Sequence, residues 1–165
     1  MRNFIFLFFI GFSFISCSDN ENDIDLGNPF NNNSKVVLRL SKDIFTTFDN
    51  NRKNNISEGD SFTIKESKRE GDNLQITLTY SGGCKDHIFE IIWDGIVYTD
   101  NPCKMNFLII HRGNFDNCEA LITDTVNINL KKLIGNIPYK DTCAYHIYST
   151  YNFSENPDII IDATN

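Results

Sequence analysis

A regular alternation of apolar and polar side chains runs through the middle of this chain. Over residues 74–80, leucine, isoleucine and tyrosine occupy every second position, and glutamine and threonine fill the positions between them. Because successive side chains of a strand point to opposite faces, this pattern gives one apolar face and one polar face. It predicts a half-buried β-strand and excludes an amphipathic helix, whose apolar positions recur every three or four residues.

Other parts of the chain show the same preference for β-branched and aromatic residues, which favours strands. These segments are 36–40, 61–65, 87–93, 96–98, 105–111, 120–130, 144–151 and 158–161. The Asp94-Gly95 pair between two of them predicts a tight hairpin. A short helix is expected only over residues 42–48.

This arrangement predicts an all-β fold, either an antiparallel β-sandwich or an irregular barrel of about eight or nine short strands. The 165 residues suffice for one domain, which we expect over residues 35–165. The apolar fraction of 41% is too high for a disordered chain. The net charge of −7 excludes a general nucleic-acid binder, because contact with phosphates needs a basic face.

The amino terminus has the organisation of a secretory signal peptide. Arg2 is followed by an apolar stretch over residues 4–12, shorter than the roughly 20 residues that a membrane-spanning helix needs. We therefore interpret residues 1–16 as a signal peptide that is removed on export and takes no part in the fold.

The end of that segment resembles the lipobox of bacterial lipoproteins. Phe14, Ile15 and Ser16 precede Cys17, with phenylalanine where leucine is commoner. The resemblance implies cleavage before Cys17, a diacylglycerol on its thiol and an acylated amino terminus. Since each buried methylene contributes about 0.8 kcal/mol, several acyl chains would anchor the protein stably to a membrane.

Residues 17–34 are expected to form a tether between this anchor and the domain. The acidic run over residues 19–25 resembles the surface-export signal of lipoproteins from Bacteroidetes such as flavobacteria, and residues 28–34 are polar and turn-rich. The resemblance implies an outer-membrane protein that faces the cell exterior.

The remaining cysteines are Cys84, Cys103, Cys118 and Cys143. An even number in an exported domain predicts disulfides. Loop lengths do not choose among the three connectivities, because each doubling of a closed loop changes its entropy cost by only about 0.6 kcal/mol. A simple meander would place Cys84 and Cys103 at the same end of the sheet.

A second resemblance bears on the pairing. Residues 80–89, His111 and residues 116–122 look like a pattern in uncharacterised Bacteroidetes lipoproteins, in which a strand ends in a Gly-Gly-Cys corner, the next strand carries a histidine, and a later strand opens with Asp-x-Cys-Glu-Ala. It covers about residues 62–133 and carries no assigned activity. It implies that Cys84 pairs with Cys118, leaving Cys103 for Cys143. Cys84–Cys103 with Cys118–Cys143 is the alternative.

A zinc site is the rival interpretation of these cysteines. Cys84-x-x-His87 and Cys143-x-x-His146 would together supply the thiolates and imidazoles of tetrahedral zinc. However, residues three apart on a regular strand point to opposite faces, and oxidation removes the thiolates. We therefore expect no metal and no cofactor.

His87, His111 and Trp93 are the weak candidates for ligand binding. Each histidine shares a strand face with apolar neighbours, so a half-buried, hydrogen-bonded histidine is the competing interpretation. Trp93, beside Asp94-Gly95, could form a platform for a carbohydrate or a lid over the core.

No catalytic residue is assigned. The chain has no Gly-x-Ser-x-Gly elbow, and no spacing pairs the carboxylates near turns and strand ends for acid–base work. Those carboxylates are Asp94, Asp116, Glu119 and Asp124. A calcium site at Asn114, Asp116 and Asn117 competes with an ordinary Asx turn at the same residues.

The sequence therefore favours a lipid-anchored envelope module that binds a glycan or an envelope protein. Two alternatives remain open. One is a metal-binding protein or enzyme that uses His87 and His111, and the other is a purely structural envelope lipoprotein.

Overall fold

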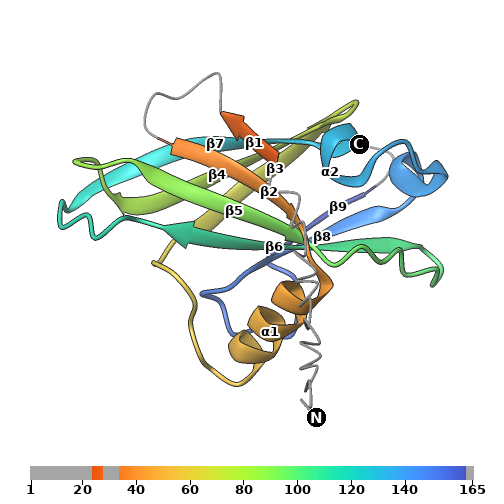
Figure 1. Ribbon diagram of the computed structural model, residues 1–165, viewed down its shortest axis with the longest axis horizontal. Helices are drawn as coiled ribbons and strands as arrows, with labels where there is room; N and C mark the ends of the chain where they lie inside the picture. The colour runs from red at the N-terminus through yellow and green to blue at the C-terminus, as the bar shows by residue number, and fades with distance from the viewer. Residues whose placement is uncertain (1–23, 28–33, 163–165) are drawn as a thin grey trace, which may run out of the picture.

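The computed structural model describes residues 24–27 and 34–162 (Figure 1). The predicted signal peptide over residues 1–16, the predicted lipidated Cys17 and most of the predicted tether lie outside the described residues. Within the described part, no helix is both long enough and apolar enough to cross a membrane.

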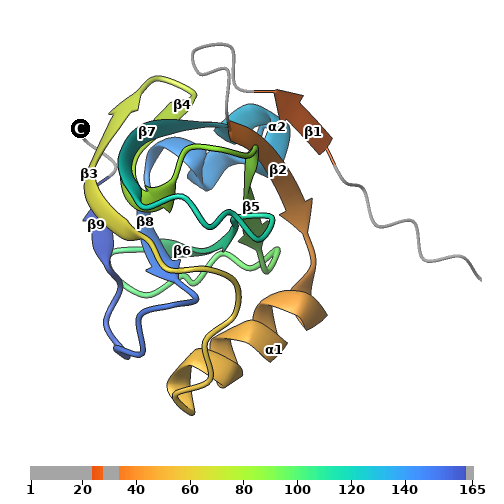
Figure 2. The same cartoon turned by 90° about the vertical axis from the view of Figure 1, so that its left-hand side faces the viewer.

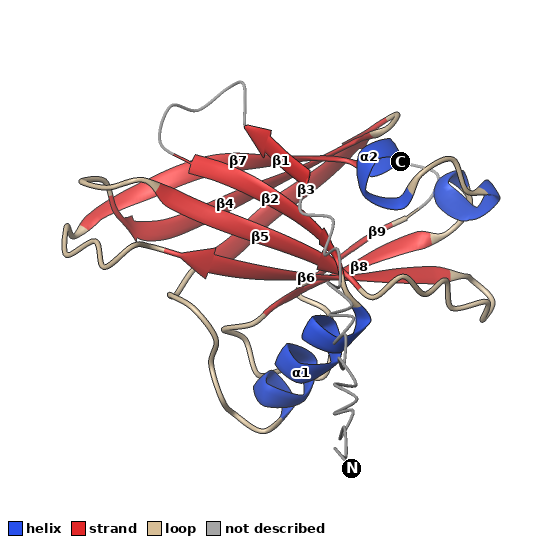
Figure 3. Ribbon diagram, in the orientation of Figure 1, coloured by secondary structure: helices blue, strands red, loops and turns tan. Residues whose placement is uncertain are grey.

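The described residues form an all-β fold with two α-helices, as the alternation predicts (Figure 3). The strands are β1 (Ile24–Gly27), β2 (Ser34–Leu40), β3 (Thr63–Glu70), β4 (Asn73–Gly82), β5 (His87–Trp93), β6 (Lys104–Arg112), β7 (Ala120–Asn129), β8 (Ala144–Ser149) and β9 (Ile159–Ile161). The helices are α1 (Lys42–Lys53) and α2 (Leu130–Ile134), and a 3-10 turn covers Pro138–Asp141.

The strands form two sheets, in the orders β1-β2-β5-β6-β8-β9 and β3-β4-β7. The two sheets approach each other on both sides, with β9 beside β3 and β2 beside β7 (Figure 2). The molecule is thus a sandwich that is nearly closed around its core. The alternation in β4 is confirmed, since Leu74, Ile76, Leu78 and Tyr80 are all buried between the sheets.

Two strand pairs differ from the antiparallel expectation. β2 pairs with β5, and β6 with β8, in parallel register. Parallel neighbours need a crossover. Between β2 and β5 the chain runs through α1, β3 and β4, and between β6 and β8 it runs through β7 and α2. Helix α1 packs on the outer face of the larger sheet (Figure 1).

The hairpin predicted at Asp94-Gly95 does not form. β5 pairs with β6 instead, and the segment after Asp94 makes only one bridge, between Tyr98 and Lys104. The cause is local: the Asp94 carboxylate accepts hydrogen bonds from the Ile96 amide at 2.9 Å and the Tyr98 hydroxyl at 2.9 Å, which curls the chain away from β5.

Helix α1 explains why β5 and β6 are apolar on both faces. Phe45 packs on Ile92, Leu108 and Ile110, which point away from the main core.

The helix extends beyond the predicted 42–48 because polar residues stabilise both of its ends. The Ser41 hydroxyl caps the first turn, and Asp49 pairs with Arg52 and Lys53 in the last turn.

Five residues of the predicted tether belong to the larger sheet, because Ser34 already begins β2 and four others form a separate strand. Ile24–Gly27 form β1, which pairs with β2 in antiparallel register. The sequence signal was missed because four residues are too few to display a periodicity.

Two disulfides tie the domain together beyond opposite ends of β6. Cys84 is bonded to Cys118 and Cys103 to Cys143, with Cα–Cα distances of 5.9 and 4.7 Å. This is the pairing that the resemblance implies. The simple meander argument fails because Cys103 and Cys143 precede β6 and β8, which run side by side in the same direction.

Candidate functional site

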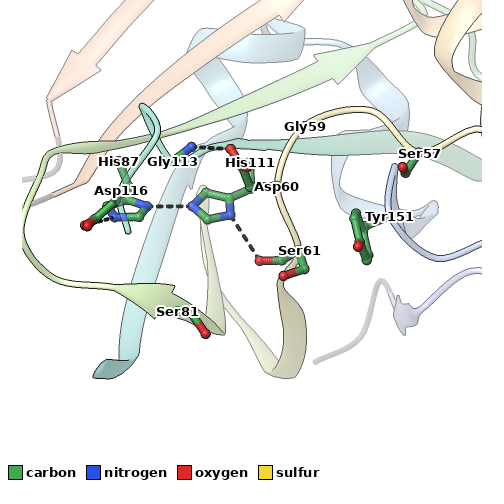
Figure 4. A pocket seen from close by; sticks show the side chains of 10 residues that line it. All are labelled: Ser57, Gly59, Asp60, Ser61, Ser81, His87, His111, Gly113, Asp116 and Tyr151. Carbon is green, nitrogen blue, oxygen red and sulfur yellow. Dashed lines mark hydrogen bonds and ion pairs between the residues drawn. The ribbon is translucent and has the colours of Figure 1, made fainter. Parts of the chain in front are cut away.

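A polar recess of about 370 Å³ lies at the end of the sandwich where β4 passes to β5 and β6 to β7 (Figure 4). The segment that joins α1 to β3 and the segment after β8 complete its walls. It is lined by Ser57, Gly59, Asp60, Ser61, Ser81, His87, His111, Gly113, Asp116 and Tyr151.

The floor of the recess is a chain of hydrogen bonds through His87 and His111. Nδ1 of His87 lies 2.8 Å from Nε2 of His111, and Nε2 of His87 lies 3.1 Å from Oδ2 of Asp116. Nδ1 of His111 lies 3.2 Å from the Ser61 carbonyl oxygen. The antiparallel register of β5 and β6 sets this geometry by placing Phe89 opposite His111. Both histidines are only 1% exposed.

Counting protons fixes the charge of this pair. The chain ends in an acceptor on both sides, the Asp116 carboxylate and the Ser61 carbonyl, so its three hydrogen bonds need three N–H groups. Two neutral imidazoles carry only two. The pair therefore holds one imidazolium when all three bonds form.

Aromatic rings enclose the two imidazoles. Tyr80 lies 4.6 Å from His87 and 4.8 Å from His111 between ring centroids, and Phe89 stacks on His111 at 4.7 Å and 11°. Burial lowers the pKa of His111, and the charge of His87 lowers it further. Both effects favour the neutral form of His111.

Asp116 holds the neighbouring corner together. Its Oδ2 atom accepts hydrogen bonds from the amides of Gly83, Cys84 and Lys85 at 2.9–3.0 Å, and its Oδ1 atom accepts one from the Cys118 amide at 2.9 Å. Amide hydrogen bonds, led by that of Cys118, hold the pKa of Asp116 well below its usual range.

The same contacts decide between the calcium site and the Asx turn. Asp116 makes the Asx turn, since its own carboxylate caps the Cys118 amide. Its oxygens are already bonded to N–H donors, which a calcium ion would have to displace, so the structure does not support calcium at Asn114, Asp116 and Asn117.

The Gly-Gly-Cys corner has a steric reason. A Cβ atom on Gly82 would lie 2.5 Å from Nε2 of His87, and the φ angle of Gly82 is +154°. Only glycine allows β4 to end this close to the imidazole. The motif that carries the resemblance is thus the one that lets Asp116 and His87 meet.

The zinc hypothesis is wrong for this arrangement. Cys84 and Cys143 belong to different disulfides beyond opposite ends of β6, so Cys84-x-x-His87 and Cys143-x-x-His146 do not meet. Among the described residues, the group whose ligand atoms lie close enough to hold a metal is Cys84, Asp116 and Cys118. Its sulfur atoms are bonded to each other and offer no thiolate.

Trp93 does not offer a platform for a carbohydrate. It is 6% exposed, belongs to the main core, and donates from Nε1 to the Ile96 carbonyl at 3.3 Å. The lid over the core is therefore the correct alternative for this residue.

The predicted carboxylates are dispersed. Asp94 is buried in its own turn, where desolvation raises its pKa, and Asp124 is buried on β7. Of the four, only Asp116 lines the recess.

Sequence reasoning missed the residues that form the open wall of the recess. Asp60 accepts a hydrogen bond from the Gly113 amide at 2.7 Å through Oδ2, and its Oδ1 atom is uncommitted within the described chain. The side-chain hydroxyls of Ser57, Ser61, Ser81 and Tyr151 make no hydrogen bond to any described residue. No periodicity links these positions, because they come from three separate segments.

Comparisons with known proteins give little guidance. No protein-family model matches the chain, and no curated protein matches it. A NigD-like immunity protein from Bacteroides caccae is similar in structure, with 16% sequence identity and a TM-score of 0.45 over 78% of this chain. This chain spans 62% of that protein. At this TM-score, the likeness carries no argument about the site.

Proposed function

We propose that this chain is an exported, lipid-anchored binding module of the outer membrane, which presents the polar recess to a ligand outside the cell. The observation that carries the proposal is the contrast within the recess. Its floor is fully hydrogen-bonded within the protein, whereas its wall carries hydroxyl groups and a carboxylate oxygen that no described residue engages.

Rigidity supports a binding role. The Cys84–Cys118 bridge, the Asp116 carboxylate and the imidazole chain all fix the loops around the recess. A site held in its bound form loses less conformational entropy when a ligand arrives, which favours affinity. The Cys17 lipobox and the acidic tether supply the address expected of a surface module.

The same geometry disfavours the alternative of an enzyme that uses His87 and His111. All four ring nitrogens of the pair already have protein partners. A general base must reach a substrate proton within about 2.6–3.2 Å, and neither ring has a nitrogen directed to the recess.

Photo-crosslinking in whole cells tests the proposal. A benzophenone amino acid at Tyr151, 42% exposed at the recess, should give an adduct with an envelope component. The matched control is Tyr139, which is 46% exposed in the 3-10 turn away from the recess. Protease treatment of the same intact cells should remove the domain.

Equal adducts at both positions, or none at Tyr151, would favour the purely structural alternative. Protection from protease until the outer membrane is ruptured would place the module in the periplasm.

A further inference from the structure

We infer that the recess binds a neutral sugar ring, with Asp60 and the serine hydroxyls as hydrogen-bonding partners and Tyr151 as the stacking surface. This inference rests on the proposed function and names its ligand class.

The uncommitted groups match a polyhydroxylated ligand. Asp60 offers a free carboxylate oxygen that can accept from two ligand hydroxyls, and Ser57 and Ser61 can each donate and accept. Because hydrogen bonds to an ionised acceptor are about twice as strong as neutral ones, Asp60 is the principal contact. An apolar ligand would leave these groups desolvated and unpaired.

Tyr151 supplies the apolar contact that a sugar ring also needs. Figure 4 shows Tyr151 and Ser57 on the side of the recess away from the imidazoles, whereas Ser61 lies beside His111. Its phenol is part of the wall and remains 42% exposed. An aromatic ring with a polar tip can pack on the C–H face of a sugar while its hydroxyl remains hydrogen-bonded.

Charge argues for a neutral ligand. The lining of the recess includes no lysine or arginine, and among the described residues no cation forms an ion pair with the Asp60 carboxylate. An anion would be repelled by it. The volume of about 370 Å³ lies within the range of roughly 300–1,000 Å³ that is common for small-ligand sites.

Saturation-transfer NMR tests the inference on the full lipidated chain in a detergent that contains no sugar. The probes are methyl glucoside, methyl galactoside, methyl mannoside and methyl glucuronide, the last being the glucoside ring with a carboxylate. We expect transfer to at least one neutral glycoside, and binding of the glucuronide about tenfold weaker than that of the glucoside.

Three variants assign the contacts. Tyr151→Ala should weaken binding of the neutral sugar about tenfold, and Tyr139→Ala should leave it unchanged. Asp60→Asn keeps an oxygen for the Gly113 amide but removes the charge, so it should bring the glucuronide within about twofold of the glucoside.

No transfer from any neutral glycoside, or a glucuronide that binds more tightly than the glucoside, would overturn the inference. So would equal losses in Tyr151→Ala and Tyr139→Ala. If the glycosides fail but Tyr151 crosslinks to an envelope protein in cells, the sugar inference is wrong and the binding module stands.

Discussion

His87 and His111 come from adjacent strands and share one hydrogen bond of 2.8 Å inside an aromatic enclosure. Neither ring reaches solvent, and each uses its second nitrogen to hold a different loop: Asp116 on one side and Ser61 on the other. The pair thus connects two loops of the recess. Its contribution to the free energy of unfolding can be measured by replacing each histidine.

A double-mutant cycle should reveal this coupling. His87→Phe and His111→Phe should each lower the free energy of unfolding by about 1–3 kcal/mol, because each leaves a buried polar partner unpaired. The double variant should lose at least about 1 kcal/mol less than the sum of the two. Urea unfolding measures all four proteins, and strict additivity would show that the two rings do not interact.

Acidification should weaken the same network. Unfolded histidine titrates near 6.5, and burial lowers the pKa of His111 in the folded chain. Between these two values the unfolded state binds more protons, so stability from His111 is complete above pH 6.5 and is lost as the pH falls through the folded pKa. The pKa of Asp116 is lowered from 3.8, so its contribution is lost only at more acidic pH.

Urea unfolding at pH 7.5 and pH 5 measures the effect. Burial also lowers the pKa of His146, so the comparison belongs in a His146→Gln background. There, the chain that retains His111 should lose more stability on acidification than its His111→Phe counterpart. Equal losses would place the acid sensitivity elsewhere.

The glycine at the corner gives a steric test. Gly82→Ala should destabilise the fold by about 2–4 kcal/mol, because its Cβ atom would lie 2.5 Å from the His87 ring and its φ angle is +154°. Gly71→Ala is the matched control: its φ angle is +58°, but nothing lies within 4 Å of the added atom. It should cost only about 1 kcal/mol. Similar Tm losses for the two variants would mean that backbone strain alone matters.

The sequence predicted the fold class because alternation is a local signal. The buried and exposed faces of β4 could be identified from its own residues, without knowing which strands lie beside it. The same holds for the apolar runs of β5 and β6. Parallel pairing could not be predicted, since it depends on long crossovers through other elements: α1, β3 and β4 lie between β2 and β5, and β7 and α2 lie between β6 and β8. The hairpin predicted at Asp94-Gly95 was wrong because the Asp94 carboxylate binds the Ile96 amide, and this local hydrogen bond competes with hairpin geometry.

The site was harder to predict for a related reason. The sequence indicates His87, His111 and Asp116 one by one, but His87 and Asp116 are 29 positions apart, and their contact depends on the Gly82 corner and the β5–β6 register. Tyr151 lies 91 residues from Asp60, whose recess it shares. Tertiary structure alone brings them together.

The disulfide pairing can be tested directly. Non-reducing peptide mapping should yield one crosslinked peptide with Cys84 and Cys118 and another with Cys103 and Cys143. Replacing either pair by serine should cost about 3–4 kcal/mol in the chain-entropy account, because the bridged residues lie 34 and 40 positions apart. A peptide that joins Cys84 to Cys103 would contradict the structure and restore the simple meander.

The anchor makes a prediction outside the described residues. Cys17→Ser should abolish lipidation, because the serine hydroxyl is a far weaker nucleophile than a thiolate. We expect the protein to leave the membrane fraction or to retain its signal peptide. Ser16→Thr, a conservative change beside the cysteine, is the control. It should still be exported, lipidated and found in the membrane fraction. Membrane fractionation and the intact mass distinguish these forms, and a Cys17→Ser protein that remained acylated would contradict the lipoprotein proposal. The oxidised cysteine pairs lie in the domain, so loss of Cys17 should leave its unfolding free energy unchanged.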